Sequence, residues 1–80
     1  MKLQIVSTTK IVELQVGGCV VPARVWEGHT EDGTPVHCFI TRIAPTIPKD
    51  DVRQRQFEEQ LIEQRAPSAE IAAIPMRLIL

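Results

Sequence analysis

The sequence of 80 residues has no tyrosine, one tryptophan, two phenylalanines and only two cysteines. Small secreted scaffolds usually carry four or more cysteines in disulfides, so two cysteines are typical of a reduced, intracellular protein. No apolar run approaches the ~20 residues that a membrane-spanning helix needs, and the stretch MKLQIVSTTK lacks the apolar core of a signal peptide. We therefore expect a cytoplasmic protein without a membrane partner.

Net charge is also nearly absent, because nine basic and ten acidic residues leave a formal charge of −1. Such a chain has no overall field that would draw it onto nucleic acid or anionic lipid. The apolar fraction of 44% and the charged fraction of 24% are ordinary for a folded domain. Because a chain of this length buries only about 60% of its unfolded surface, we expect one domain over residues 1–80 and no large enclosed active site.

Three segments show the sequence patterns of strands. Lys10–Val16 alternates apolar and polar residues and is followed by Gly17-Gly18, a dipeptide suited to a tight hairpin turn. Cys19–Glu27 is expected to be the second strand. Asp32-Gly33 indicates another two-residue turn, after which residues 34–43 are expected to form the third strand.

The rest of the chain predicts one main helix and short terminal elements. Asp50 or Asp51 is the expected N-cap of a helix that runs to about Arg65, since an amphipathic stripe lies among strong helix formers there. Ser68 is expected to cap a short helical turn through Ala73. Residues 76–80 resemble a final strand, and residues 1–6 form either a further strand or an extension of the first.

The predicted fold is therefore α+β, an antiparallel β-meander of three main strands plus a terminal strand or strands, with one main helix packed on one face. The first turn places Leu14 opposite Val21 and Val12 opposite Ala23. The second places Val25 opposite Ile40, Trp26 opposite Phe39 and Glu27 opposite Cys38. A one-residue slip would move every side chain to the other face. The combined registers predict a core face of Val12, Leu14, Val16, Val21, Ala23, Val25, Val36, Cys38 and Ile40.

The other face of the predicted sheet is unusually apolar, although a solvated face should be mostly polar. Tryptophan and arginine are enriched at interface hot spots, so Trp26 opposite Phe39 would make a compact aromatic anchor. Two arrangements account for this face: it is an interaction surface, or the C-terminal segment covers it. The predicted binding residues are Trp26, Phe39, Arg24, His37, Thr41 and Ile11, beside Val20, Pro22 and Ile43.

Metal and thiol chemistry are less well supported. In the predicted register the two cysteines lie at distant points of the sheet, so they share neither a metal ion nor a disulfide. Cys38 has Glu27 across from it and His29 diagonally across, which is the outline of an activated thiol. Cys38 also belongs to the predicted core, where a cysteine usually acts as a small hydrophobe. We expect no metal, no cofactor and no catalytic residue, and a thiol enzyme that uses Cys38 remains an alternative.

Single-stranded nucleic acid is a further alternative ligand, because Arg24, Arg42 and Lys10 lie near two aromatic residues on the sheet. The segments ARVWEGHTEDGTPVHCFITRIA and APSAEIAAIPMRLIL resemble small uncharacterised bacterial proteins associated with mobile elements such as phages, plasmids and gene cassettes. This resemblance implies an accessory role in which the protein binds and modulates another protein. Our preferred interpretation is a non-enzymatic interaction protein that self-associates, most simply as a dimer, through its outer sheet face.

Overall fold

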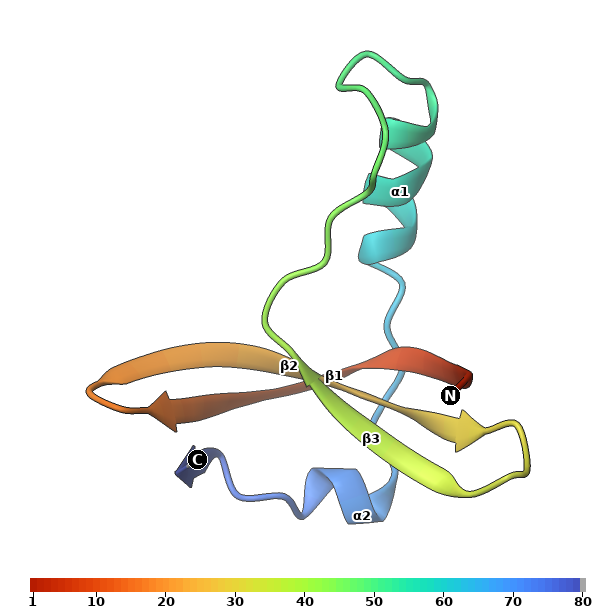
Figure 1. Ribbon diagram of the computed structural model, residues 1–80. Coiled ribbons are helices and arrows are strands. Elements are labelled where there is room, and N and C mark those ends of the chain that lie inside the picture. Colours follow the sequence, from red (N-terminus) through yellow and green to blue (C-terminus); the bar gives the residue numbers. More distant parts are fainter. Residues whose placement is uncertain (80) are drawn as a thin grey trace.

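The computed structural model describes residues 1–79 and contains a four-stranded sheet and two helices (Figure 1). The elements, in chain order, are β1 (Leu3–Val16), β2 (Cys19–Thr30), β3 (Pro35–Ile40), α1 (Arg53–Leu61), α2 (Ala69–Ala72) and β4 (Arg77–Ile79). The strand order is β3-β2-β1-β4, and β4 runs parallel to β1. The α+β class is thus confirmed, and β1, β2 and β3 form an antiparallel meander, whereas the parallel strand β4 makes the sheet as a whole mixed. Leu80, the end of the predicted last strand, lies outside the described residues.

The β1–β2 hairpin follows the predicted register. Leu14 pairs with Val21 and Val12 with Ala23. Gly17 has a φ of +60°, which suits a type II′ turn with glycine at its first central position. Both strands are longer than predicted, since β1 begins at Leu3 and β2 ends at Thr30. Residues 1–6 therefore extend the first strand for most of their length.

A bulge in β1 interrupts this hairpin between Ser7 and Ile11. Thr8 in the bulge is fully buried, and its hydroxyl donates a hydrogen bond of 2.6 Å to the carbonyl oxygen of Val25. The bulged backbone also holds Arg65: Thr9 N–H donates to the Arg65 carbonyl at 3.0 Å, and Arg65 N–H donates to the Ser7 carbonyl at 3.2 Å. The bulge therefore anchors the segment that runs from α1 to α2.

The second hairpin differs from the prediction by one residue. Gly33, with a φ of +88°, donates its N–H to the Thr30 carbonyl at 3.1 Å, and Thr30 N–H donates to the Thr34 carbonyl at 3.0 Å. The loop thus holds three residues, 31–33, rather than the two that Asp-Gly alone indicates. Because one extra loop residue shifts the pairing by one, each β3 side chain lies on the face opposite to the predicted one.

The observed pairs across β2 and β3 are Val25 with Phe39, Trp26 with Cys38 and Glu27 with His37. The buried core consists of Val12, Leu14, Ala23, Val25 and Ile71, with Phe39, Ile74 and Leu78 packed against it. The predictions of Val36, Cys38 and Ile40 as core residues are wrong, because their register places them on the outer face. Val21 is only half-buried and Val16 is exposed.

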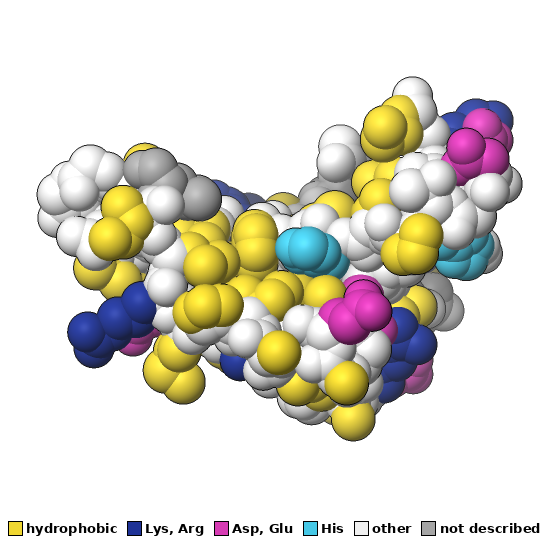
Figure 2. Space-filling view, turned by 90° about the horizontal axis from the view of Figure 1, so that it is seen from below, with side chains coloured by type: hydrophobic (Ala, Val, Ile, Leu, Met, Phe, Trp, Pro, Cys, Tyr) yellow, Lys and Arg dark blue, Asp and Glu magenta, His cyan; other side chains and the backbone are white. Residues whose placement is uncertain are grey.

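Helix α2, rather than the main helix, covers the core face. The Ser68 hydroxyl accepts a hydrogen bond from Ile71 N–H at 3.4 Å, which confirms the predicted cap. Ile71 then enters the core beside the short parallel strand β4. Figure 2 views this side of the molecule and shows hydrophobic side chains reaching the surface across its centre, so α2 covers the core face only in part.

Helix α1 stands away from the sheet on the side opposite α2 (Figure 1), and as far as the structure describes the chain it has no buried residue. Its N-cap is Val52 rather than the predicted Asp50 or Asp51, although Asp51 Oδ1 accepts from Arg53 N–H at 2.8 Å. The guanidinium of Arg53 lies 2.8 Å from Asp51 Oδ2 and lowers the pKa of that carboxyl. The predictions that this helix reaches Arg65 and packs on the sheet are both wrong. We call residues 41–64 the α1 arm.

Candidate interaction groove

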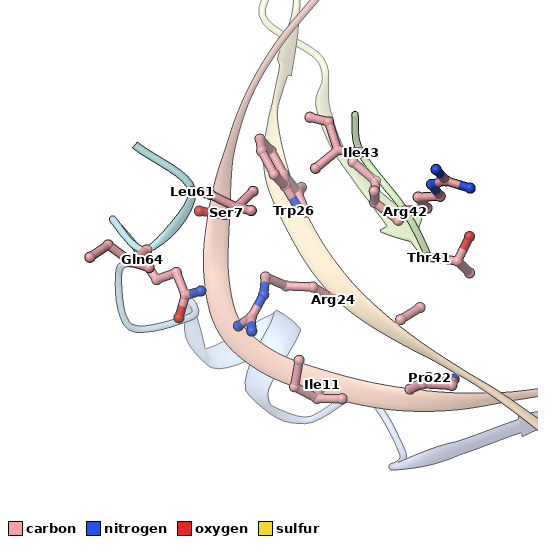
Figure 3. Close-up of a pocket in the computed structure, with 13 residues that line it drawn as sticks. Ser7, Ile11, Pro22, Arg24, Trp26, Thr41, Arg42, Ile43, Leu61 and Gln64 are labelled. Carbon is pink, nitrogen blue, oxygen red and sulfur yellow. The ribbon is translucent and has the colours of Figure 1, made fainter. Parts of the chain in front are cut away.

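A groove lies between the outer face of the sheet and the base of the α1 arm. Its volume is about 420 Å³, and Figure 3 shows its lining side chains. The lining residues come from β1, β2, β3 and the arm: Ser7, Ile11, Pro22, Ala23, Arg24, Trp26, Ile40, Thr41, Arg42, Ile43, Leu61, Ile62 and Gln64. Apolar side chains dominate this set, so the groove suits an apolar or amphipathic partner surface.

Trp26 lies in the middle of the groove. It is half-buried and pairs with Ser7 on β1 and Cys38 on β3. Figure 3 shows its ring between Ser7 and Ile43, so the arm residue Ile43 approaches it from the side of β3. A partly exposed indole among apolar neighbours offers a large contact area and an N–H donor, as interface anchors do.

Arg24 crosses from the groove to the bulge of β1. Its Nη1 donates a hydrogen bond of 2.8 Å to the carbonyl oxygen of Thr8. This contact orients the side chain, so that its aliphatic stem lines the groove while its head binds backbone. Arg24 and Arg42 are the ionisable side chains of the described lining, which gives the groove a positive charge.

The structure brings four of the six predicted binding residues to this groove: Trp26, Arg24, Ile11 and Thr41. Figure 3 shows Thr41 pointing away from Trp26, at the rim. Phe39 and His37 are on the core face instead, as an edge-to-face pair with ring centroids 5.5 Å apart. The register slip at the second hairpin is the cause, and the predicted pairing of Trp26 with Phe39 is wrong.

Leu61 and Ile62 at the base of the arm line the groove, although the sequence interpretation placed them on a helix packed against the sheet. Their place in an amphipathic stripe was visible in the sequence. The direction in which the helix leaves the sheet was not, because it depends on how residues 62–67 dock on the β1 bulge.

The predicted thiol site is not assembled. Cys38 pairs with Trp26 on the outer face, whereas Glu27 lies on the core face, so their predicted pairing is wrong. Glu27 is bound elsewhere: Arg65 Nη2 lies 2.6 Å from its Oε1, and Ser68 N–H donates to its Oε2 at 3.1 Å. Among residues 1–79, no three histidine, cysteine, aspartate or glutamate side chains lie close enough together to hold a metal ion.

A second hollow, of about 300 Å³, lies on the core face around Glu27, His29, His37 and Glu70. Its one buried carboxylate, Glu27, already has a cation and a backbone donor. In the described part of the chain every buried side-chain nitrogen and oxygen atom has a hydrogen-bond partner. This hollow therefore presents no unsatisfied buried group to a ligand, and the Trp26 groove is the better candidate.

Two further observations bear on partners. Trp26 and Phe39 are on opposite faces, so the aromatic stacking surface that the nucleic-acid alternative requires is not formed. No helix within residues 1–79 is both long and apolar enough to cross a membrane. Comparisons of the chain with known protein families, with curated proteins and with solved structures found no match.

Proposed function

We propose that this protein is a non-enzymatic interaction protein that works as a homodimer, with the Trp26 groove and the α1 arm at its interface. The observation that carries the proposal is the exposed area. The single chain exposes 6295 Å², whereas a compact monomer of its mass exposes about 4,850 Å². Its Cα radius of gyration is 14.4 Å, against about 12 Å for a compact domain of this length.

The excess of roughly 1,400 Å² per chain is what a subunit of a stable dimer would bury. Standard interfaces bury about 800 Å² per partner, and obligate homodimers bury more. The projecting arm causes much of the excess, because no residue of α1 is buried within the described chain. A helix of nine residues is marginal in water by itself, so a partner that covers it would stabilise it.

The surface near the arm has the composition of an interface. Large exposed apolar side chains gather around the groove: Ile11, Ile43, Leu61 and Ile62. Trp26 supplies an aromatic anchor at the centre, and Arg24, Arg42 and Gln64 supply polar groups. An apolar centre with polar groups around it is the usual arrangement of a specific protein interface. A second copy is the simplest occupant, because two-fold interfaces are self-complementary and the commonest.

The mobile-element association and the accessory role remain predictions from the sequence resemblance. A dimer that buries the groove would leave the partly covered core face and the free edge of β3 for another protein. Binding and modulation of a second protein would then use the assembled dimer.

The test is the molar mass in solution by light scattering on a sizing column over a concentration series. We expect twice the chain mass of 9.0 kDa. Replacement of the central anchor, Trp26→Ala, should raise the dimer dissociation constant about tenfold or more, which corresponds to about 1.4 kcal/mol. Val20→Ala is the matched control, because Val20 is an exposed apolar residue of β2 that does not line the groove.

A wild-type protein that stays monomeric at every concentration would contradict the proposal. So would a Trp26→Ala variant that dimerises as tightly as Val20→Ala. Far-ultraviolet circular dichroism shows whether the variant is folded. If Trp26→Ala does not fold, Ile43→Ser replaces it, because Ile43 is an exposed groove residue outside the regular elements, and the same increase in dissociation constant is expected.

A further inference from the structure

The order of charges along α1 is unfavourable for an isolated helix. Arg53 and Arg55 lie in its first turn, and Glu58 and Glu59 lie towards its C-terminus. The helix dipole favours acidic residues at the N-terminus and basic residues at the C-terminus, which is the reverse of this order. The order Arg55 then Glu59 is also the weaker orientation of an i, i+4 ion pair. Arg53 is paired with Asp51, whereas the pairing of Arg55 with Glu59 contributes little to α1 itself.

The same helix carries an exposed seam at coiled-coil spacing. Val52, Arg55, Glu59 and Ile62 follow at intervals of three, four and three residues. At 100° per residue they fall within an arc of about 80° on one side of the helix. Val52 and Ile62 both keep right-handed helical dihedrals at the two ends of α1. They are 83% and 78% exposed, whereas Phe57, on the other side, is partly buried.

We propose that α1 pairs antiparallel with α1 of a second copy along this seam, which deepens the proposed function and rests on it. An antiparallel arrangement centred on Phe57 places Val52 of each copy beside Ile62 of the other. It also places Arg55 of each copy beside Glu59 of the other, twice, because of the two-fold symmetry. The seam is then apolar at both ends and paired by opposite charges in the middle, and the two helix dipoles oppose each other.

The position of the arm agrees with this pairing. In Figure 1 the chain climbs from β3 to the tip of the arm, and α1 descends from there towards the sheet, so Val52 is near the tip and Ile62 near the base. Antiparallel pairing therefore brings the tip of one arm to the base of the other. Ile62 lines the Trp26 groove, so the incoming Val52 lies at the edge of that groove. One interface thus covers both exposed features of the chain.

Charge reversal tests the seam. Arg55→Glu and Glu59→Arg should each raise the dimer dissociation constant about tenfold or more, because the symmetry repeats the new repulsion at two places. Gln60→Arg is the control, since it adds a charge to an exposed side chain of α1 that points about 120° away from the middle of the seam, and it should dimerise like the wild type.

The decisive measurement is the mixture of the two variants. Within each single variant the charges at positions 55 and 59 repel, in its own helix and between identical copies. When an Arg55→Glu chain pairs with a Glu59→Arg chain, position 55 of each chain faces the opposite charge at position 59 of the other. An equimolar mixture should therefore form a heterodimer, detected by native mass spectrometry. Each variant keeps the repulsion within its own helix when the two are mixed, and only the contact between chains changes. Recovery of dimerisation in the mixture therefore shows pairing between chains rather than a change in helix stability.

Two results would overturn the seam while leaving the proposed function standing: single variants that dimerise like the wild type, or weakened variants that do not form the heterodimer when mixed. A wild-type protein that is monomeric throughout would overturn both proposals. Selective weakening by the two seam reversals, no effect of Gln60→Arg, and recovery of dimerisation in the mixture would together support the seam.

Discussion

Glu27 is expected to hold the C-terminal segment on the core face, and Glu27→Ala should release it. Glu27 is 9% exposed, and its carboxylate accepts from Arg65 Nη2 at 2.6 Å and from Ser68 N–H at 3.1 Å. Ser68 caps α2, which carries Ile71 into the core. Loss of the carboxylate thus removes a charge-assisted hydrogen bond and a backbone hydrogen bond at the start of the covering segment.

The magnitude follows from the exposure of the two partners. Removing one partner of a fully buried ion pair costs about 3–5 kcal/mol, because the other charge is left buried. The Arg65 side chain is 55% exposed, so its guanidinium can return to water after the change. We therefore expect Glu27→Ala to lower the free energy of unfolding by about 2–3 kcal/mol, near the upper range for hydrogen bonds to a charged group.

Urea denaturation at fixed protein concentration measures this change, since stability that depends on dimerisation also depends on concentration. Amide hydrogen exchange at Ile71 should accelerate in parallel. Glu27→Gln is the matched control, because it keeps an acceptor for Ser68 and removes the charge. Its free energy of unfolding should lie between those of the wild type and Glu27→Ala. A Glu27→Ala variant whose free energy of unfolding is within about 0.5 kcal/mol of the wild-type value, as for ordinary surface changes, would refute this account.

Three other changes test the strands and turns. A methyl group at Gly28 would lie 1.8 Å from the carbonyl oxygen of Gln4. Gly28→Ala should therefore lower the free energy of unfolding by more than about 1 kcal/mol, and amide exchange at the start of β1 should become faster. Thr8→Val removes the buried hydroxyl that is bonded to the Val25 carbonyl, and it should lower the free energy of unfolding, measured by urea denaturation, by about 1–2 kcal/mol. Hydrogen bonds from the threonine hydroxyls beside Asp32 lower the pKa of its carboxyl below the ordinary 3.8, so carbon-13 titration should show a midpoint under that value. The turn should keep this stabilisation above pH 3.8 and lose it as the pH falls through the lowered pKa.

The sequence by itself determined the local features of this protein. A Gly-Gly dipeptide with positive φ at its first glycine sets the turn between β1 and β2, so the pairs Leu14–Val21 and Val12–Ala23 follow from the loop length alone. The Ser68 cap is likewise local, because it needs only a hydroxyl and an N–H three residues later. Trp26, Arg24 and Ile11 belong to one face for the same reason, since their register depends on that first turn.

Only the tertiary structure decided the remainder. Whether Asp32-Gly33 closes a two-residue or a three-residue loop depends on hydrogen bonds between Thr30 and Thr34, and that one residue decides which face of the sheet receives Phe39, His37 and Cys38. The direction of the α1 arm depends on the docking of Arg65 between the β1 bulge and Glu27. The contacts of Arg65 with Ser7, Thr9 and Glu27 join residues far apart in the chain, so no short pattern encodes them. The predicted outer face therefore contained the right tryptophan, while the face of Phe39 was set by the length of the second turn and the helical wall of the groove by long-range packing.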